Sequence, residues 1–110
     1  QTISVTLNIF SLEQKSGSKI RLGNNLFNPS IGGTAKIWYT VPSSGNVSLK
    51  IYDISGKLIR TVFDGYSNSG TMYREWNGKN DGGSNVSPGV YILRYVYPGG
   101  KEDRKIGVMK

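Results

Sequence analysis

The stretch WNGKNDGGSNVSPGVY (76–91) places a tryptophan and a tyrosine at the two ends of a segment rich in glycine and asparagine. Asparagine and aspartate side chains form Asx turns, glycine accepts a positive φ, and a Pro-Gly pair sets up a following strand. This composition predicts a compact connection between two strands. Trp76 and Tyr91 are then expected in the core, one at each end of the loop.

Two kinds of binding loop use similar residues. A calcium loop of the D-x-[DN]-x-[DN]-G type needs oxygen ligands at alternating positions. Counted from Asn77, the third position is Lys79, which brings a cation instead of a ligand, and no glutamate closes the loop. A phosphate loop leads into a helix N-terminus, and no helical pattern follows. Asn77, Asn80 and Asp81 still offer oxygens for adventitious calcium, but we expect no required metal or cofactor.

Alternation of apolar and polar residues predicts short strands along most of the chain. Ser55-Gly56 supplies a hairpin turn between two of them, Asp64-Gly65 closes the return strand, and Pro42 ends an earlier one. Six to eight strands at spacings of about ten residues indicate a sandwich or barrel of antiparallel sheets. The side chains expected to point inward are Ile37, Tyr39, Val41, Val47, Leu49, Ile51, Tyr91, Leu93, Tyr95, Ile106 and Val108.

Composition excludes several classes of function. The 110 residues fit one domain, and alanine and other good helix formers are sparse. Cysteine and histidine are both absent, which removes disulfides, thiolate nucleophiles and the commonest general base. The carboxylates stand mostly at turns, where they accept local hydrogen bonds. We therefore expect no enzymatic activity.

Charge and hydropathy restrict the classes of partner that we expect for the chain. The net charge is +7, but the basic residues are dispersed, and the tightest group, KEDRK (101–105), is interrupted by two acids. Nucleic-acid binders usually gather their charge into a patch, so we expect no nucleic-acid partner. No apolar run of 18 residues exists, so we expect no membrane span. The start, QTISVTLNIF, lacks the features of a signal peptide, and we interpret the chain as part of a longer protein.

Three stretches together resemble the FlgD-type Ig-like domain and the related C-terminal sorting domains of type IX secretion cargo. NVSLKIYDISGKLIRTVFDG (46–65) precedes the pattern W-N-G-x-N-x-x-G-x-x-V-x-x-G-x-Y. NLFNPSIGGTAKIWYTVP (25–42) is similar to the family's opening, with Leu26 where a proline is usual, and RKIGVMK (104–110) is similar to its last strand. The motif residues in this chain are Trp76, Asn77, Gly78, Asn80, Gly83, Val86, Gly89 and Tyr91.

The resemblance implies an all-β, Ig-like or fibronectin-like antiparallel β-sandwich of about seven strands over residues 19–110. Residues 1–18 would be a strand or linker from a preceding region. It also implies a non-catalytic C-terminal module of a larger secreted or cell-surface bacterial protein. Such a module would serve spacing, surface attachment or export recognition, with the preceding domains and the secretion or cell-surface machinery as partners. The terminal strand RKIGVMK is expected at a sheet edge, where it could pair with another chain.

The alternative function is a carbohydrate-binding module of a secreted glycoside hydrolase. Trp38 and Tyr52 both alternate outward, and if the two faces align they would form one aromatic platform for a polysaccharide. Arg104 and Lys105 are predicted as outward charges that a partner would contact. Arg74 is an anomaly, because it shares strand parity with Trp76; a bulge or a position at the sheet edge would resolve it.

Overall fold

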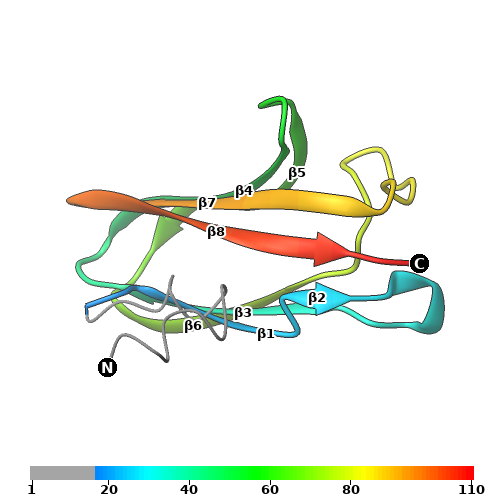
Figure 1. Ribbon diagram of the computed structural model, residues 1–110. Coiled ribbons are helices and arrows are strands. Elements are labelled where there is room, and N and C mark those ends of the chain that lie inside the picture. The colour runs from blue at the N-terminus through cyan, green and yellow to red at the C-terminus, as the bar shows by residue number, and fades with distance from the viewer. Residues whose placement is uncertain (1–16) are drawn as a thin grey trace, which may run out of the picture.

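The computed structural model describes residues 17–110, which form a sandwich of two β-sheets (Figure 1). The predicted all-β sandwich is confirmed, and no α-helix occurs within 17–110. The expectations for residues 1–16 fall outside this range. The strands are β1 (Ile20–Gly23), β2 (Leu26–Phe27), β3 (Ala35–Val41), β4 (Gly45–Asp53), β5 (Leu58–Ser67), β6 (Gly70–Trp76), β7 (Gly89–Tyr97) and β8 (Gly100–Val108).

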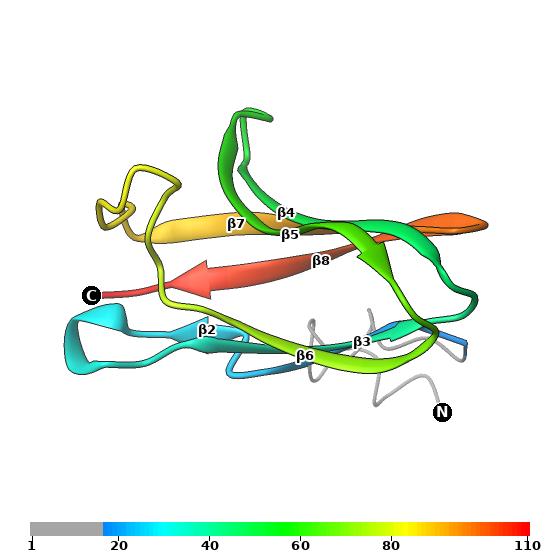
Figure 2. The same cartoon turned by 180° about the vertical axis from the view of Figure 1, so that it is seen from behind.

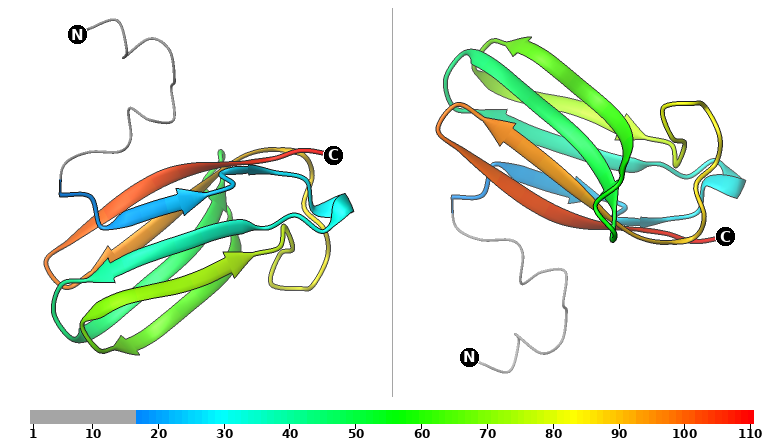
Figure 3. Two further views of the ribbon diagram at one scale, coloured as in Figure 1. Left: turned by 90° about the horizontal axis from the view of Figure 1, so that it is seen from below. Right: turned by 90° about the horizontal axis from the view of Figure 1, so that it is seen from above.

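The strands form a three-stranded sheet in the order β1-β3-β6 and a five-stranded sheet in the order β2-β8-β7-β4-β5. Figure 3 views the sandwich from its two faces, with the three-stranded sheet nearer the viewer on the left and the five-stranded sheet nearer on the right. All neighbouring strands are antiparallel except β2 and β8, which pair in parallel. Between β1 and β2 the chain crosses from one sheet to the other at Asn24. Among the described residues, Asn24 is the one non-glycine residue with a positive φ, 53°.

The predicted alternation places the core correctly. Ile37, Tyr39 and Val41 of β3 are buried and face the buried side chains of β4 and β7 across the sandwich. Pro42 follows the last residue of β3, as expected. The buried apolar residues that fill the sandwich are Ile20, Phe27, Ala35, Ile37, Tyr39, Val41, Val47, Leu49, Ile51, Trp76, Tyr91, Leu93, Tyr95, Ile106 and Val108.

The hairpin of β4 and β5 turns at Asp53–Lys57 and projects away from the sandwich (Figure 2). Gly56 has a φ of 92° in this turn, as the Ser55-Gly56 pair predicted. The predicted end of the return strand was wrong, because β5 continues through Asp64-Gly65 to Ser67. Gly65 pairs with Val47, and the Asp64 carboxylate lies 3.8 Å from the Lys50 ammonium of β4. Cross-strand pairing thus overrides the turn preference of Asp-Gly.

Arg74 is accommodated by the sheet edge. It pairs in regular register with Ile37, and β6 is the outermost strand of its sheet. The Arg74 side chain is exposed, and its guanidinium carbon lies 4.5 Å from the centre of the Phe63 ring. Phe63 belongs to β5, the outermost strand of the other sheet. The contact therefore joins the two sheets at their common open side.

The end of the terminal strand is not a free edge, which corrects the prediction for RKIGVMK. β2 pairs with Gly107 and Val108 on the side of β8 that β7 leaves open. The backbone N–H of Gly107 donates to Asn25 O at 2.7 Å, and that of Met109 donates to Phe27 O at 2.9 Å. A Cβ on Gly107 would lie 2.7 Å from Leu26 Cδ1, so glycine permits this close approach. Another chain cannot add to the strand at this end.

Candidate functional site

The motif loop is anchored by Trp76, which is 1% exposed. Its ring packs edge-on against Phe27 and Tyr91, with centroid distances of 5.7 and 5.6 Å. Its indole Nε1 donates a hydrogen bond of 2.8 Å to the backbone oxygen of Lys79 in the loop. Tyr91, at the other end, is buried and donates from its hydroxyl to Ser87 O at 2.6 Å. Both aromatic residues therefore hold the loop to the core.

The side-chain oxygens of the loop are engaged in its own turns. Asn77 Oδ1 accepts from Lys79 N at 3.1 Å, and Asn80 Oδ1 accepts from Ser84 N at 3.0 Å. Asp81 Oδ1 accepts from the backbone N–H of Thr61 in β5 at 3.0 Å. Each side chain considered as a calcium ligand thus uses one oxygen to stabilise a turn or the edge of β5. Within 17–110, no group of three or more potential metal-ligating side chains comes together.

The remaining motif residues set the path of the loop. Gly78, Gly83 and Gly89 all have a positive φ. A Cβ on Gly78 would lie 3.0 Å from Pro29 Cγ, so the loop packs closely on the 3-10 turn η2 (Pro29–Ile31). The half-buried Val86 packs against the core and donates its N–H to Gly78 O at 2.9 Å. The motif therefore builds a connection between β6 and β7.

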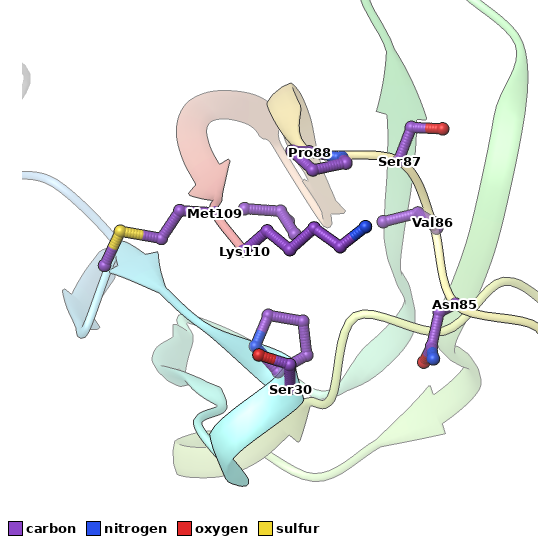
Figure 4. Close-up of a pocket in the computed structure, with 9 residues that line it drawn as sticks. Ser30, Asn85, Val86, Ser87, Pro88, Met109 and Lys110 are labelled. Carbon is purple, nitrogen blue, oxygen red and sulfur yellow. The ribbon is translucent and has the colours of Figure 1, made fainter.

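A crevice opens at the end of the sandwich where the chain leaves β8 (Figure 4). Its volume is about 310 Å³, and three segments far apart in sequence line it: Pro29–Ser30, Asn85–Pro88 and Val108–Lys110. The groups available are hydroxyls, one amide, backbone atoms and the Lys110 ammonium, with no carboxylate side chain or imidazole. A hydroxyl without a general base is a weak nucleophile, so this crevice suits binding and not catalysis.

A polar cluster lies where the chain enters the sandwich. The Glu102 carboxylate accepts from Ser18 Oγ at 3.0 Å and from the backbone N–H of Lys19 at 2.8 Å. Arg104 donates to Ser18 Oγ and to Asp103 O, and its Nη2 lies 3.4 Å from Glu102 Oε1. The sequence interpretation did not identify this cluster. The sequence carries a signal for the cluster, because Glu102 and Arg104 occupy alternate strand positions in phase with the inward-facing Ile106 and Val108.

Arg104 is therefore not an outward charge, and that prediction was wrong. Its side chain is 6% exposed, and among the described residues its Nε has no hydrogen-bond partner. Lys105, the next residue, is exposed on the opposite face of the strand. Only Lys105 of this pair can meet a partner from outside.

Trp38 and Tyr52 do not form a shared platform. Trp38 projects from the three-stranded sheet on the side away from the core, and Tyr52 projects from the five-stranded sheet on the side away from the core. Because the two core faces meet, the outer faces point in opposite directions. Trp38 is also flanked on its own sheet: the Arg21 guanidinium lies 4.2 Å from its ring centre, and the Tyr73 ring lies 4.9 Å away.

The carboxylates with shifted pKa values are hydrogen-bond acceptors. The pKa of Asp53 is lowered mainly by the Ser55 hydroxyl, and that of Glu75 mainly by the Tyr73 hydroxyl. Arg94 lowers the pKa of Asp103 through a two-pronged contact of 2.9 and 3.0 Å. A carboxyl that serves as a general acid needs a raised pKa, whereas these three hold their charge more firmly than usual. They do not resemble catalytic acids.

The fold and the turn-rich loop define an Ig-like β-sandwich domain. The family model of the FlgD Ig-like domain matches residues 24–99, and the chain belongs to this family. The match identifies a small Ig-like domain and no catalytic family. No curated protein sequence matches the chain.

Several solved structures have the same fold, and three of them come from Porphyromonas gingivalis and Pseudomonas aeruginosa. PorZ of Porphyromonas gingivalis, described as an essential bacterial surface component of the type-IX secretion system, matches with TM-score 0.58 and 20% identity over 83% of this chain. Dimeric latent PorU of the same organism matches with TM-score 0.59 and 21% identity over 82% of this chain. FlgD of Pseudomonas aeruginosa matches with TM-score 0.54 and 20% identity over 82% of this chain and 69% of its own.

These proteins differ greatly in length. The chain spans 11% of PorZ and 9% of PorU, so in both proteins the matching fold is a small part of a long chain. Within residues 17–110, no helix is long and apolar enough to cross a membrane.

Proposed function

We propose that the chain is a non-catalytic Ig-like module of a larger secreted or cell-surface bacterial protein, in which it serves spacing and recognition. One geometric observation carries the proposal. The described chain enters at one end of the sandwich and Lys110 lies at the opposite end (Figure 1). A domain built this way separates whatever precedes it from its own C-terminal end. The nine residues of β8 alone span about 30 Å at the usual rise of a strand.

The polar cluster at the entrance supports the spacing role. Glu102 binds Ser18 and Lys19, and Arg104 binds Ser18, so the first described residues are tied to β8. A connection tied in this way gives the preceding domains a more fixed direction than a chain attached at one point only. We propose the preceding domains of the same chain as its first partners.

The crevice beside Lys110 supports the recognition role. The C-terminal residues lie there beside the motif loop and the 3-10 turn, so a partner that contacts Lys110 also contacts Asn85 or Ser30. Secretion or cell-surface machinery is the proposed partner. The similarity to PorZ, a surface component of a secretion system, favours this class of partner.

Surface display of the parent protein tests recognition. The double variant Lys110→Glu/Asn85→Asp changes the charge of the crevice by about −3, without touching a buried side chain. The matched control, Lys57→Glu/Asn46→Asp, makes the same change at exposed positions outside the crevice. We expect display to fall for the crevice variant alone, with unchanged thermal unfolding for both. Equal display of both variants would leave the module as a spacer without recognition.

A further inference from the structure

On the outer face of the three-stranded sheet, side chains from β1, β3 and β6 lie beside one another in rows across the strands. Register places Arg21, Trp38 and Tyr73 in one row, and Thr40 beside Thr71 in the next. Figure 3 (left) shows this face of the sheet toward the viewer. The small side chains of Thr40 and Thr71 lie next to the large Trp38 indole, so the surface is lower beside the ring. The result is a hollow of about 220 Å³, lined by Ser18, Lys19, Ile20, Arg21, Trp38, Thr40 and Thr71.

The floor of this hollow offers two threonine hydroxyls, Thr40 and Thr71. The backbone N–H of Thr40 donates to Lys19 O, and its backbone oxygen accepts a hydrogen bond from the Tyr95 hydroxyl. Within residues 17–110, neither the Thr40 nor the Thr71 hydroxyl makes a hydrogen bond. Thr71 is exposed and Thr40 and Trp38 are half-buried, so a ligand can reach all three.

Two cations at the hollow lack a carboxylate partner within the described range. Other basic side chains are paired, such as Lys36 with Glu75 at 3.6 Å and Arg94 with Asp103 at 2.9 Å. Arg21, by contrast, stacks on Trp38 and donates no hydrogen bond to a described residue. The Lys19 ammonium donates to Gly17 O at 3.0 Å. The lining therefore carries two cations and no acidic residue, and Glu102, which binds Ser18 and the Lys19 backbone, is itself paired with Arg104.

We propose that this hollow binds one residue of an anionic saccharide, with a uronic acid as the chemical class. The ligand carboxylate would meet the Arg21 guanidinium, which matches a carboxylate with two parallel donors. The sugar hydroxyls would meet Thr40 and Thr71, and its carbon face would meet the exposed part of Trp38. The volume is below the range of about 300–1,000 Å³ typical of drug-sized ligands, which suits a single sugar residue.

The lining favours a saccharide over the other anions. A free inorganic anion would need the two cations but not the indole or the threonine floor. An acidic peptide would use the two cations, but its carboxylate side chains would offer no flat carbon face to the indole. The proposal concerns a face separate from the C-terminal crevice and holds whichever protein carries the module.

Tryptophan fluorescence of the full chain measures the binding. The chain has two tryptophans, and Trp76 is 1% exposed, so a ligand-dependent change reports on Trp38. The probes are oligogalacturonate, neutral malto-oligosaccharide of the same length, oligoglutamate and sodium sulfate. We expect saturable binding of oligogalacturonate that weakens as ionic strength rises.

Matched variants locate the site. Arg21→Gln should weaken binding about tenfold, because it removes a charge-assisted contact, and Thr71→Val should weaken it about twofold to tenfold. Lys36→Gln on the same face and Lys105→Gln on the opposite face remove the same charge outside the hollow and should leave the affinity unchanged. Unchanged melting temperatures would show that all four variants fold.

Four results would overturn the proposal. Equal weakening by the two control variants would show diffuse attraction to a basic surface. Binding of the neutral oligosaccharide with the same affinity would remove the role of the carboxylate. Competition by sulfate at the same concentration as oligogalacturonate would indicate a simple anion site. Tighter binding of oligoglutamate would indicate a peptide site.

Discussion

Trp76 combines packing with a hydrogen bond at one residue. Its ring contacts Phe27 and Tyr91, and its Nε1 fixes the Lys79 carbonyl of the loop. Trp76→Ala should lower the free energy of unfolding by about 3–5 kcal/mol, the range for truncating a buried aromatic side chain. The control Tyr66→Ala, at a side chain 64% exposed, should cost about 0.5 kcal/mol or less. A loss below about 1 kcal/mol for Trp76→Ala in urea unfolding would contradict a core role.

Arg104 and Glu102 form a pair that depends on both partners. Glu102→Gln leaves the buried Arg104 without a carboxylate, and should cost about 3–5 kcal/mol, toward the lower end because Glu102 keeps some exposure. The double variant Glu102→Gln/Arg104→Met removes the buried charge as well and should recover much of that loss. Additive costs in the double-mutant cycle would show that the two side chains do not interact.

Tyr95 makes stability fall at alkaline pH. Burial raises the pKa of its hydroxyl above the ordinary value of about 10. Above pH 10 the unfolded chain therefore releases this proton while the folded chain keeps it, so the free energy of unfolding decreases as pH rises. Tyr95→Phe should lose about 1 kcal/mol at pH 7, because the hydroxyl donates to Thr40 O at 2.7 Å.

The same variant should flatten the alkaline decline, which thermal unfolding between pH 8 and 11 would measure. The control Tyr66→Phe should keep the slope of the original protein. An undiminished slope in Tyr95→Phe would mean that another group controls the alkaline limb.

The motif loop is a structural connection whose asparagine and aspartate side chains already accept hydrogen bonds. Asn77, Asn80 and Asp81 accept hydrogen bonds from Lys79, Ser84 and Thr61. Calcium would have to compete with these bonds, and the described residues gather no group of three metal-ligating side chains, so melting curves recorded with calcium and with chelator should coincide. A ligand that binds the native state must raise the melting temperature by mass action. A rise of about ten degrees with calcium would therefore show that the loop is a metal site.

Alternation predicted the central strands well and the edges poorly. β3, β4 and β7 are each buried on one face, so the alternation of apolar and polar residues identifies their inward side chains. The crossing at Asn24 has no such signal, because a single left-handed residue sends a two-residue strand into the other sheet. β5 continues past Asp64-Gly65 because it pairs with β4, and the turn preference of the Asp-Gly pair gives no information about that pairing.

The candidate sites show the same division. The aromatic ends of the motif loop followed from spacing, and Trp38 and Tyr52 were correctly predicted as outward residues of their strands. Their separation on opposite faces depends on which sheet each strand joins, and local pattern does not decide this. The burial of Arg104 could have been predicted, since it shares parity with Ile106 and Val108, but its charge led to the opposite prediction.

The two ends of the sandwich make different contacts and, as proposed, have different roles. The entrance ties the incoming chain to β8 through Glu102 and Arg104, and the far end presents Lys110 beside the motif loop. In the core between the two ends, the described residues form no group of side chains typical of a catalytic site. The module is therefore expected to act as a part attached to a larger exported protein.

Transfer of the module to another exported protein tests whether the module itself directs surface display. A reporter that is exported but not displayed would carry residues 1–110 at its C-terminus, in a cell that makes the parent protein, and surface display would be measured by protease accessibility on intact cells. We expect display of the reporter with the native module. Display should fall when Trp76→Ala destabilises the module and when Lys110→Glu/Asn85→Asp alters the crevice. Equal display of the reporter with and without the module would contradict the account.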